Sequence, residues 1–368
     1  MIYLDHAATT RPDEAVIRAV TDAMSAAWRN PGAAYSASDV PRRMLRQARQ
    51  AIAGMLNAKP QEVLFTAGGT EGNNQALTLA KDGHVIVGAV EHASVLKAAR
   101  GRAAQVTVIP PDGNGRIPPE AIERALRPDT RLICVQYANN ETGALQPVAE
   151  IGALARSRHV PFLCDAVQAF GKVPIDVRSL NVDLLTLSAH KFYGPRGAGC
   201  LYARQGVPLR PLLEGGGQEF GLRSGTEDVP AIEGMRVAAE LAGREMNARL
   251  ARMRELESAF IRSLKRRVPG CRLLAEDAPR LPGVMALLMP GLSSEQAVAR
   301  LDLMGIQVSA GAACSARSDQ ISHVYLAMGL SEADARCVIR VSPGWENTAG
   351  EMELAAAAIA GVYGKRSV

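Results

Sequence analysis

Apolar and polar residues alternate along the first two-thirds of the chain with two different periods. Short apolar runs are typical of strands buried on both faces, whereas longer stretches place an apolar residue at every third or fourth position, as a helix does. These patterns predict helices at residues 13–28, 40–56, 70–79, 93–99, 119–126 and 148–157, and strands at residues 63–65, 84–90, 106–109, 132–136, 161–164 and 184–187. Strands that alternate with helices predict an α/β fold with a mostly parallel sheet between two layers of helices.

The pattern changes near residue 228. A long helical stretch runs from there to about residue 267, and the remainder combines further helices with short strands at residues 272–274, 284–288, 307–309 and 338–341. A chain of 368 residues exceeds the usual size of one hydrophobic core, so two domains are expected. We predict a large domain over residues 15–245 and a smaller α+β domain made of residues 1–14 and 246–368.

Composition and charge narrow the class of protein. A hydrophobic content of 47% and a charged content of 21% are typical of a globular protein. The net charge of +5 could indicate nucleic-acid binding, but aromatic residues make up only 4% and the basic residues from 244 to 267 are interspersed with glutamates, as on a solvated helix face. No apolar stretch of about 20 residues and no secretory signal is present. We therefore expect a cytoplasmic protein with neither nucleic-acid nor membrane partners.

The six cysteines are widely spaced and form no Cys-x-x-Cys pair, which argues against a zinc site or a disulfide scaffold. No metal is expected. Five of them lie in apolar, strand-like surroundings and are predicted to be small buried hydrophobes. Cys314 differs, because it follows the small residues Ser309 to Ala313, which would leave a thiol accessible. A buried core cysteine remains the alternative at this position.

The stretch around Lys191 carries the first candidate chemistry. A buried strand is expected to end at Ser188-Ala189-His190-Lys191. A lysine can form a Schiff base with an aldehyde cofactor, while neighbouring hydroxyl and imidazole groups can hold its phosphate. An ordinary surface lysine is the alternative. However, only seven of the 42 basic residues are lysines, so a lysine at this position indicates that an amine is needed.

Two further stretches follow predicted strands. Gly68-Gly69-Thr70 could hold a phosphate at a helix start, or the helix could simply be capped by Thr70. Asp165 could pair with a pyridinium nitrogen, or it could cap the next helix. The 26 residues between Asp165 and Lys191 suffice for one excursion and a return strand, so both side chains can emerge at one edge of the sheet.

Two polar residues also lie at strand ends. His92 could stack on a cofactor ring, although a lone histidine is more often structural. Asn140 could offer its amide to a ring hydroxyl.

Taken together, these motifs resemble the cysteine desulfurases, which are pyridoxal-phosphate enzymes of the class-V aminotransferase group. The resemblance spans essentially the whole chain, and the loop around Cys314 resembles that of the branch related to nitrogenase and iron–sulfur assembly. The matching stretches are residues 3–10, 68–71, 91–92, 139–143, 165–168, 188–191, 215–219 and 223–226. The resemblance implies pyridoxal-phosphate (PLP) fold type I with a seven-stranded sheet in the large domain, pyridoxal 5'-phosphate as cofactor, L-cysteine as substrate, and an obligate homodimer.

The resemblance also implies roles for individual residues. Lys191 would be the Schiff-base lysine, His92 would stack on the ring and Asp165 would pair with the ring nitrogen. Gln168 and Asn140 would lie near the ring hydroxyl. The phosphate would be held by Gly69, Thr70, Ser188 and His190 and by Thr226 of the other subunit.

For the substrate, the resemblance implies that Arg340 binds the carboxylate of cysteine, next to Asn140. Cys314 would take the sulfur as a persulfide and deliver it to an acceptor protein, either an iron–sulfur scaffold or a carrier.

Several positions depart from the family pattern, and they concern the loop and its docking rather than the named catalytic groups. They are Tyr35, Phe220, Gln320, Ile321 and Trp345. Two alternatives stay open from sequence alone. One is a PLP-dependent lyase that acts on selenocysteine or a cysteine conjugate without a persulfide carrier. The other is a sulfur-carrier or scaffold partner that has lost catalytic activity.

Overall fold

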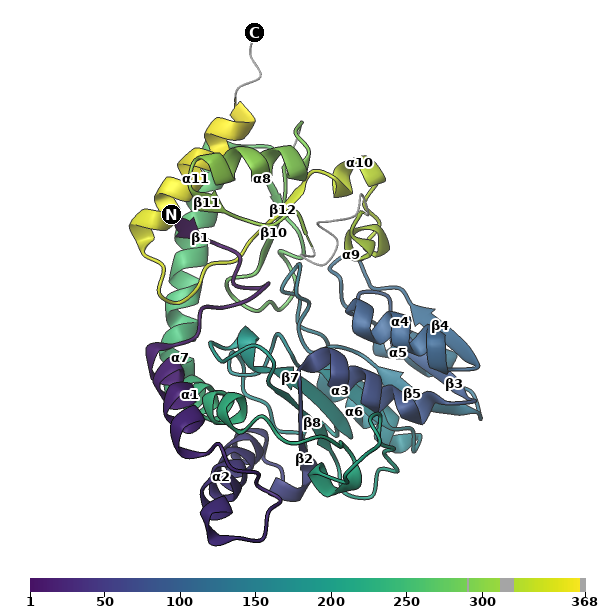
Figure 1. The fold of residues 1–368 in the computed structure, drawn as a ribbon. Helices are drawn as coiled ribbons and strands as arrows, with labels where there is room; N and C mark the ends of the chain where they lie inside the picture. Colours follow the sequence, from purple (N-terminus) through teal and green to yellow (C-terminus); the bar gives the residue numbers. More distant parts are fainter. Residues whose placement is uncertain (290, 312–320, 365–368) are drawn as a thin grey trace.

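The computed structural model describes residues 1–289, 291–311 and 321–364, and its main feature is a seven-stranded sheet (Figure 1). The strand order is β2-β8-β7-β6-β5-β3-β4, and only β8 runs antiparallel to its neighbours. The strands are β2 (Val63–Thr66), β3 (His84–Gly88), β4 (Gln105–Ile109), β5 (Thr130–Cys134), β6 (Phe162–Asp165), β7 (Leu184–Ser188) and β8 (Gly199–Ala203). The predicted α/β fold with a mostly parallel sheet is confirmed.

Helices cover both faces of this sheet, so its inner strands are buried along almost their whole length. Successive side chains of a strand point to opposite faces. Leu184 therefore belongs to a core shared with α3 and α4, whereas Leu185 belongs to a core on the other face with α2, α5, α6 and α7. The helices before α7 are α1 (Glu14–Ala26), α2 (Asp39–Leu56), α3 (Gly69–Ala76), α4 (Ala93–Arg102), α5 (Pro119–Ala125) and α6 (Val148–Ser157). All six lie within a few residues of their predicted positions.

A second part of the molecule is built on two small sheets. An antiparallel sheet has the order β12-β10-β9, and β1 pairs with β11 in parallel. The strands are β1 (Ile2–Tyr3), β9 (Arg272–Leu273), β10 (Met285–Leu288), β11 (Ile306–Gln307) and β12 (Val338–Val341), and the helices are α8 (Ser294–Leu303), α9 (His323–Ala327), α10 (Glu332–Ala335) and α11 (Ala349–Gly364). Their apolar side chains form a separate core with Leu4.

Two segments join the parts. Helix α7 (Val229–Arg267) contributes Met235 to a core of the large sheet and Phe260 to the core of the small sheets (Figure 1). The predicted boundary at residue 245 falls inside this helix, and the division into domains stays a prediction. The N-terminal segment also passes between the parts, since the backbone N–H of His6 donates to Ser342 O at 2.9 Å. None of the helices in the described ranges is long and apolar enough to cross a bilayer.

Candidate active site

A cleft of about 740 Å³ opens where the parallel strands of the large sheet end. Residues that follow β2, β3, β5, β6 and β7 line it, at the edge where open α/β sheets bind their ligands. The cleft brings together ten residues assigned from the sequence: Gly69, Thr70, His92, Asn140, Asp165, Gln168, Ser188, His190, Lys191 and Arg340. Thr226 does not line the cleft of its own chain, and Cys314 lies outside the described residues.

Lys191 ends a 3₁₀ turn directly after β7. Its Nζ donates to the backbone oxygens of Ala7 and Ala8, both at 2.7 Å. The N-terminal segment is itself held against this turn, since the backbone N–H and hydroxyl of Thr10 donate to His190 O at 2.9 and 3.0 Å. The amine is therefore fixed in the cleft by two carbonyl groups of the N-terminal segment.

The His190 ring, next to Lys191 in the chain, is uncharged at neutral pH. Its Nδ1 lies 3.2 Å from Thr9 Oγ1. Burial and, next, the nearby Lys191 ammonium lower the pKa of His190 to about 4. The ring can therefore offer an N–H group to a phosphate without carrying a charge at neutral pH.

The start of α3 forms an anion site in the cleft. The helix begins at Gly69 with Gly68 as its N-cap, and no described side chain caps it, so Thr70 is not the cap. A Cβ atom added at Gly69 would lie 2.5 Å from Val167 Cγ2, and one at Gly68 would lie 3.4 Å from Ser188 Oγ. The glycines thus let the helix start sit directly against the strand ends, and its backbone N–H groups can bind an anion.

Asp165 is a buried carboxylate at the end of β6. Its Oδ2 accepts from Asn73 Nδ2 at 2.8 Å, and its Oδ1 accepts from the Val167 backbone N–H at 3.0 Å. Thr186 fixes the Asn73 amide by donating to Asn73 Oδ1 at 2.8 Å. Both donors to Asp165 are neutral, although a buried carboxylate is most stable beside a positive charge. The site is suited to a cationic ring nitrogen.

The His92 ring is held by the same network. His92 Nδ1 accepts from the Ser94 backbone N–H at 3.1 Å and lies 2.8 Å from Ser94 Oγ, which in turn accepts from Asn73 Nδ2 at 2.9 Å. Since Nδ1 accepts, the proton of the neutral ring is on Nε2. His92 is also the N-cap of α4, which fixes the ring where it lines the cleft.

Arg340 enters the cleft from β12 on the opposite side. Its side chain is 1% exposed and donates to Asp5 Oδ1 at 2.7 Å and to Asn140 O at 2.9 Å. Its Nε is buried without a partner in the described part of the chain. A guanidinium with N–H groups still free fits a carboxylate ligand.

These groups fit pyridoxal phosphate. The amine of Lys191 can bind its aldehyde, Asp165 its ring nitrogen and the start of α3 its phosphate. The fit rests on the neutral surroundings of the Asp165 carboxylate and on the absence of a side-chain cap among the described neighbours of α3. The roles of the individual residues stay predictions.

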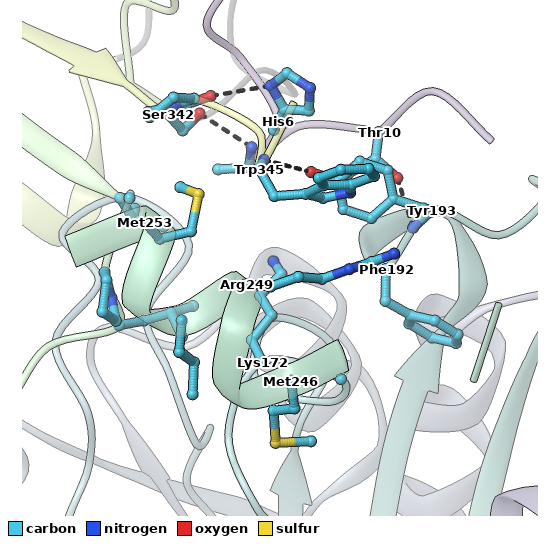
Figure 2. Close-up of a pocket in the computed structure, with 18 residues that line it drawn as sticks. His6, Thr10, Lys172, Phe192, Tyr193, Met246, Arg249, Met253, Ser342 and Trp345 are labelled. Carbon is cyan, nitrogen blue, oxygen red and sulfur yellow. Dashed lines mark hydrogen bonds between the residues drawn. The ribbon is translucent and has the colours of Figure 1, made fainter. Parts of the chain in front are cut away.

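The departures from the family pattern that fall in the described ranges do not line the cleft. Tyr35 and Phe220 are exposed, Ile321 packs against the largest hydrophobic core, and Gln320 lies outside the described residues. Trp345 borders a second cavity of about 60 Å³, which shares Ala7 with the cleft (Figure 2).

Arg249 corrects one expectation at this second cavity. The basic residues of the long helix were expected on a solvated face, but the Arg249 guanidinium lies 4.8 Å from the ring centre of Trp345 and 5.2 Å from that of Tyr193. Figure 2 shows it reaching from α7 toward both rings. A cation is attracted to aromatic faces, and this draws the side chain inward.

Three residues of the site were missed in the sequence: Asn73, Ser94 and Lys172. Asn73 follows Gly69 by four positions on the same helix, so the two share a face, and this spacing could have revealed it. Ser94 follows His92 by two positions, which is the spacing at which an N-cap side chain accepts from a backbone N–H of its helix. Lys172 lines the second cavity, where no sequence motif pointed to it.

Comparison with known proteins finds similarity over nearly the whole chain. The family model described as aminotransferase class-V matches residues 2–354. The putative cysteine desulfurase IscS 1 of Bacillus subtilis is 39% identical, over 98% of each chain. The NifS-like protein of Rickettsia africae superposes with a TM-score of 0.92 and 31% identity over 99% of both chains. A structure of SspA in complex with cysteine has a TM-score of 0.81 and 33% identity, over 95% of this chain and all of that one.

Proposed function

The chain belongs to the class-V aminotransferase family, and we infer from this membership that it is a pyridoxal-phosphate-dependent cysteine desulfurase. It converts L-cysteine to L-alanine and transfers the sulfur through an enzyme cysteine to an acceptor protein. The inference is supported above all by the single cleft that gathers the Lys191 amine, the Asp165 carboxylate and the Arg340 guanidinium. The relatives that match over almost their full length carry the name cysteine desulfurase.

The residues of the cleft have separable tasks. The bound cofactor supplies an electron sink for the α-carbon of the substrate. Asp165 would hold a proton on the ring nitrogen of the cofactor, and the start of α3 would hold its phosphate. With substrate bound, Lys191 Nζ would take the α-proton and return it, as a general base and acid.

Arg340 orients the substrate by binding its carboxylate. SspA, a structural relative, has been solved with cysteine bound, and this supports a cysteine-sized ligand in the equivalent fold. The free N–H groups of Arg340 and the backbone of Asn140 lie on the same side of the cleft. Substrate cysteine would thus present its sulfur away from the Arg340 strand.

We propose Cys314 as the sulfur acceptor within the enzyme. Its thiolate attacks the substrate sulfur, an S–S bond forms and the C–S bond breaks. The electron pair of that bond stays with carbon, which takes up a proton to become the methyl group of alanine. Cys314 lies outside the described residues, but both flanks approach Glu141, the neighbour of Asn140: Ser322 Oγ donates to its Oε2 at 2.6 Å, and a Cβ atom at Gly311 would lie 3.5 Å from that oxygen.

The partners beyond cysteine are also proposals. Thr226 is exposed, and Arg223 nearby pairs with Glu71 of α3 at 2.9 Å. The 223–226 stretch thus lies near the start of α3, and this supports a homodimer in which Thr226 reaches the partner's phosphate. We propose an iron–sulfur scaffold or a sulfur carrier as the acceptor protein, and the cytoplasm as the location.

The test is to incubate the loaded protein with L-cysteine, to quantify alanine, and to search Cys314 for one added sulfur atom by mass spectrometry. Cys314→Ala should abolish both signals, while Cys337→Ala, at a partly buried cysteine, should keep them. Retained turnover in Cys314→Ala would indicate a lyase on selenocysteine or a cysteine conjugate. No product and no visible absorbance with added pyridoxal phosphate would indicate a non-enzymatic protein.

A further inference from the structure

A second amine lies next to the cleft. Lys172 follows Gly171 in the turns after β6, and Gly171 has a φ of +75°. A Cβ atom at Gly171 would lie 3.0 Å from Ala242 Cβ and 3.2 Å from Phe192 Cβ. The turn therefore packs closely against α7 and the segment after Lys191, and this directs the Lys172 side chain inward.

Hydrogen bonds connect the two amines. Lys172 Nζ donates to Gln168 Oε1 at 3.2 Å, and Gln168 Nε2 donates to Ala7 O at 2.7 Å. The same carbonyl oxygen accepts from Lys191 Nζ at 2.7 Å. Gln168 lines the cleft, so Lys172 contacts a cleft residue from behind.

The surroundings of Lys172 are apolar. It lines the second cavity with Phe192, Met246 and Met253 (Figure 2). In the ranges that the structure describes, no carboxylate forms an ion pair with its Nζ. Burial and, next, the positive charge of Lys191 lower the pKa of Lys172 to about 7.

The other ionisable groups that line the second cavity offer no unpaired carboxylate to the Lys172 ammonium. They are His6, which is paired with Glu346, Arg249, which is paired with Glu245, and Tyr193.

The contact with Lys172 decides how the Gln168 amide is oriented. Lys172 Nζ donates to Gln168 Oε1, and a lysine ammonium has donors only, so the amide oxygen faces Lys172. The amide nitrogen carries two hydrogens, and the Ala7 carbonyl takes one. The other remains for a ligand in the cleft.

We propose that Lys172 is a positioning residue that locks the Gln168 amide with its N–H group toward the cleft, where that group binds the anionic oxygen of the cofactor ring. The proposal rests on the proposed function only for the identity of this oxygen. Without Lys172, the amide can flip and present its own oxygen, which repels an anion.

The experiment compares wild type with Lys172→Met, Lys172→Arg, Gln168→Met and the Lys172→Met/Gln168→Met double variant. Lys81→Met, at an exposed lysine, is the charge-matched control. The dissociation constant for pyridoxal phosphate and the pH midpoint of the visible band of the loaded protein are measured for each. Alanine formation by the wild type is measured separately, so failure of the proposed function is recognised independently.

We expect Lys172→Met to weaken pyridoxal-phosphate binding about fivefold, the effect of one neutral hydrogen bond, and to raise the pH midpoint. The midpoint rises because a ring oxygen without its donor holds a shared proton more tightly. Lys172→Arg should restore most of both values, Lys81→Met should change neither, and the double variant should be no weaker than Gln168→Met.

Three results would overturn the proposal. The first is a Lys172→Met variant with wild-type affinity and midpoint. The second is a double variant in which the two losses multiply, because Lys172 would then act independently of Gln168. The third is a Lys172→Arg variant as impaired as Lys172→Met. If Lys172→Met does not fold by circular dichroism, Lys172→Leu, which also lacks a donor, is judged by the same criteria.

Discussion

Replacing Arg340 by lysine tests how the cleft selects a carboxylate. A guanidinium carries five N–H groups in a planar fork. Two of them are already used, toward Asn140 O and Asp5 Oδ1, and Nε is buried without a described partner. One N–H group on each Nη therefore remains for a ligand, enough for a two-bond contact with a carboxylate.

A lysine at this position keeps the charge but has only three N–H groups. If it maintained the contacts with Asn140 and Asp5, one N–H group would remain for the substrate, so one charge-assisted hydrogen bond is lost. Such a bond contributes about 1.5–3 kcal/mol, or roughly a 10- to 150-fold change in affinity. We expect Arg340→Lys to raise the KM for L-cysteine by this factor with a smaller change in kcat, because the lost contact is present before and during the reaction.

The assay is alanine formation as a function of L-cysteine concentration. Arg336→Lys, an exposed arginine on the same segment, serves as the control and should match the wild type. Cysteamine lacks the carboxylate, so its affinity, followed by the change in visible absorbance, should differ less than twofold between Arg340→Lys and the wild type. A KM for cysteine within threefold of the wild-type value would show that the guanidinium fork does not select the carboxylate, as would a loss of cysteamine binding equal to that of cysteine binding.

Three further changes have defined outcomes. Asp165→Asn removes the charge beside the ring nitrogen and should slow alanine formation about 10- to 100-fold, by the loss of one charged hydrogen bond, without loss of secondary structure by circular dichroism. Gly152→Ala would place a Cβ atom 1.9 Å from Leu180 O and should lower the free energy of unfolding by about 1–3 kcal/mol in urea, whereas Gly54→Ala, with open space around it, should not. The pKa of His190 is about 4 in the folded chain and ordinary in the unfolded chain, so the unfolded state takes up the proton first as pH falls from about 6.5 to 4, and the free energy of unfolding decreases. Urea midpoints measured at pH 7, 5 and 4 should therefore fall less in His190→Gln than in the wild type. An equal fall in both would contradict the low pKa of His190.

The large sheet was predictable where each strand is a continuous apolar run. Leu184–Ser188 is buried at every residue, and such a run is specified locally by its own side chains. The neighbouring strand Gly199–Ala203 was not predicted, since its glycine-rich start looks like a turn. Its place between β2 and β7 depends on pairs such as Phe65 with Cys200, which are far apart in sequence.

The cleft was predictable for a related reason. Asp165 ends a parallel strand, His92 and Lys191 follow two others, and parallel strands end at one edge of the sheet. Arg340 could not be placed in this way, because it comes from a different sheet. Its position depends on the N-terminal segment, where Asp5 forms a bridge with Ser342 and an ion pair with Arg340.

The use of lysine in place of arginine indicated functional residues that their positions in the sequence alone did not. The scarcity of lysine in this arginine-rich chain singled out Lys191, and the same scarcity applies to Lys172. Lys59, Lys81 and Lys97 are exposed and Lys265 is paired with Glu276 near the surface. The two lysines that remain among the described residues are those joined through Gln168 and Ala7. Lysine, unlike arginine, can release its proton where it is buried beside a second amine, so the apolar wall next to the Lys191 amine favours lysine, although either side chain can donate to the Gln168 oxygen.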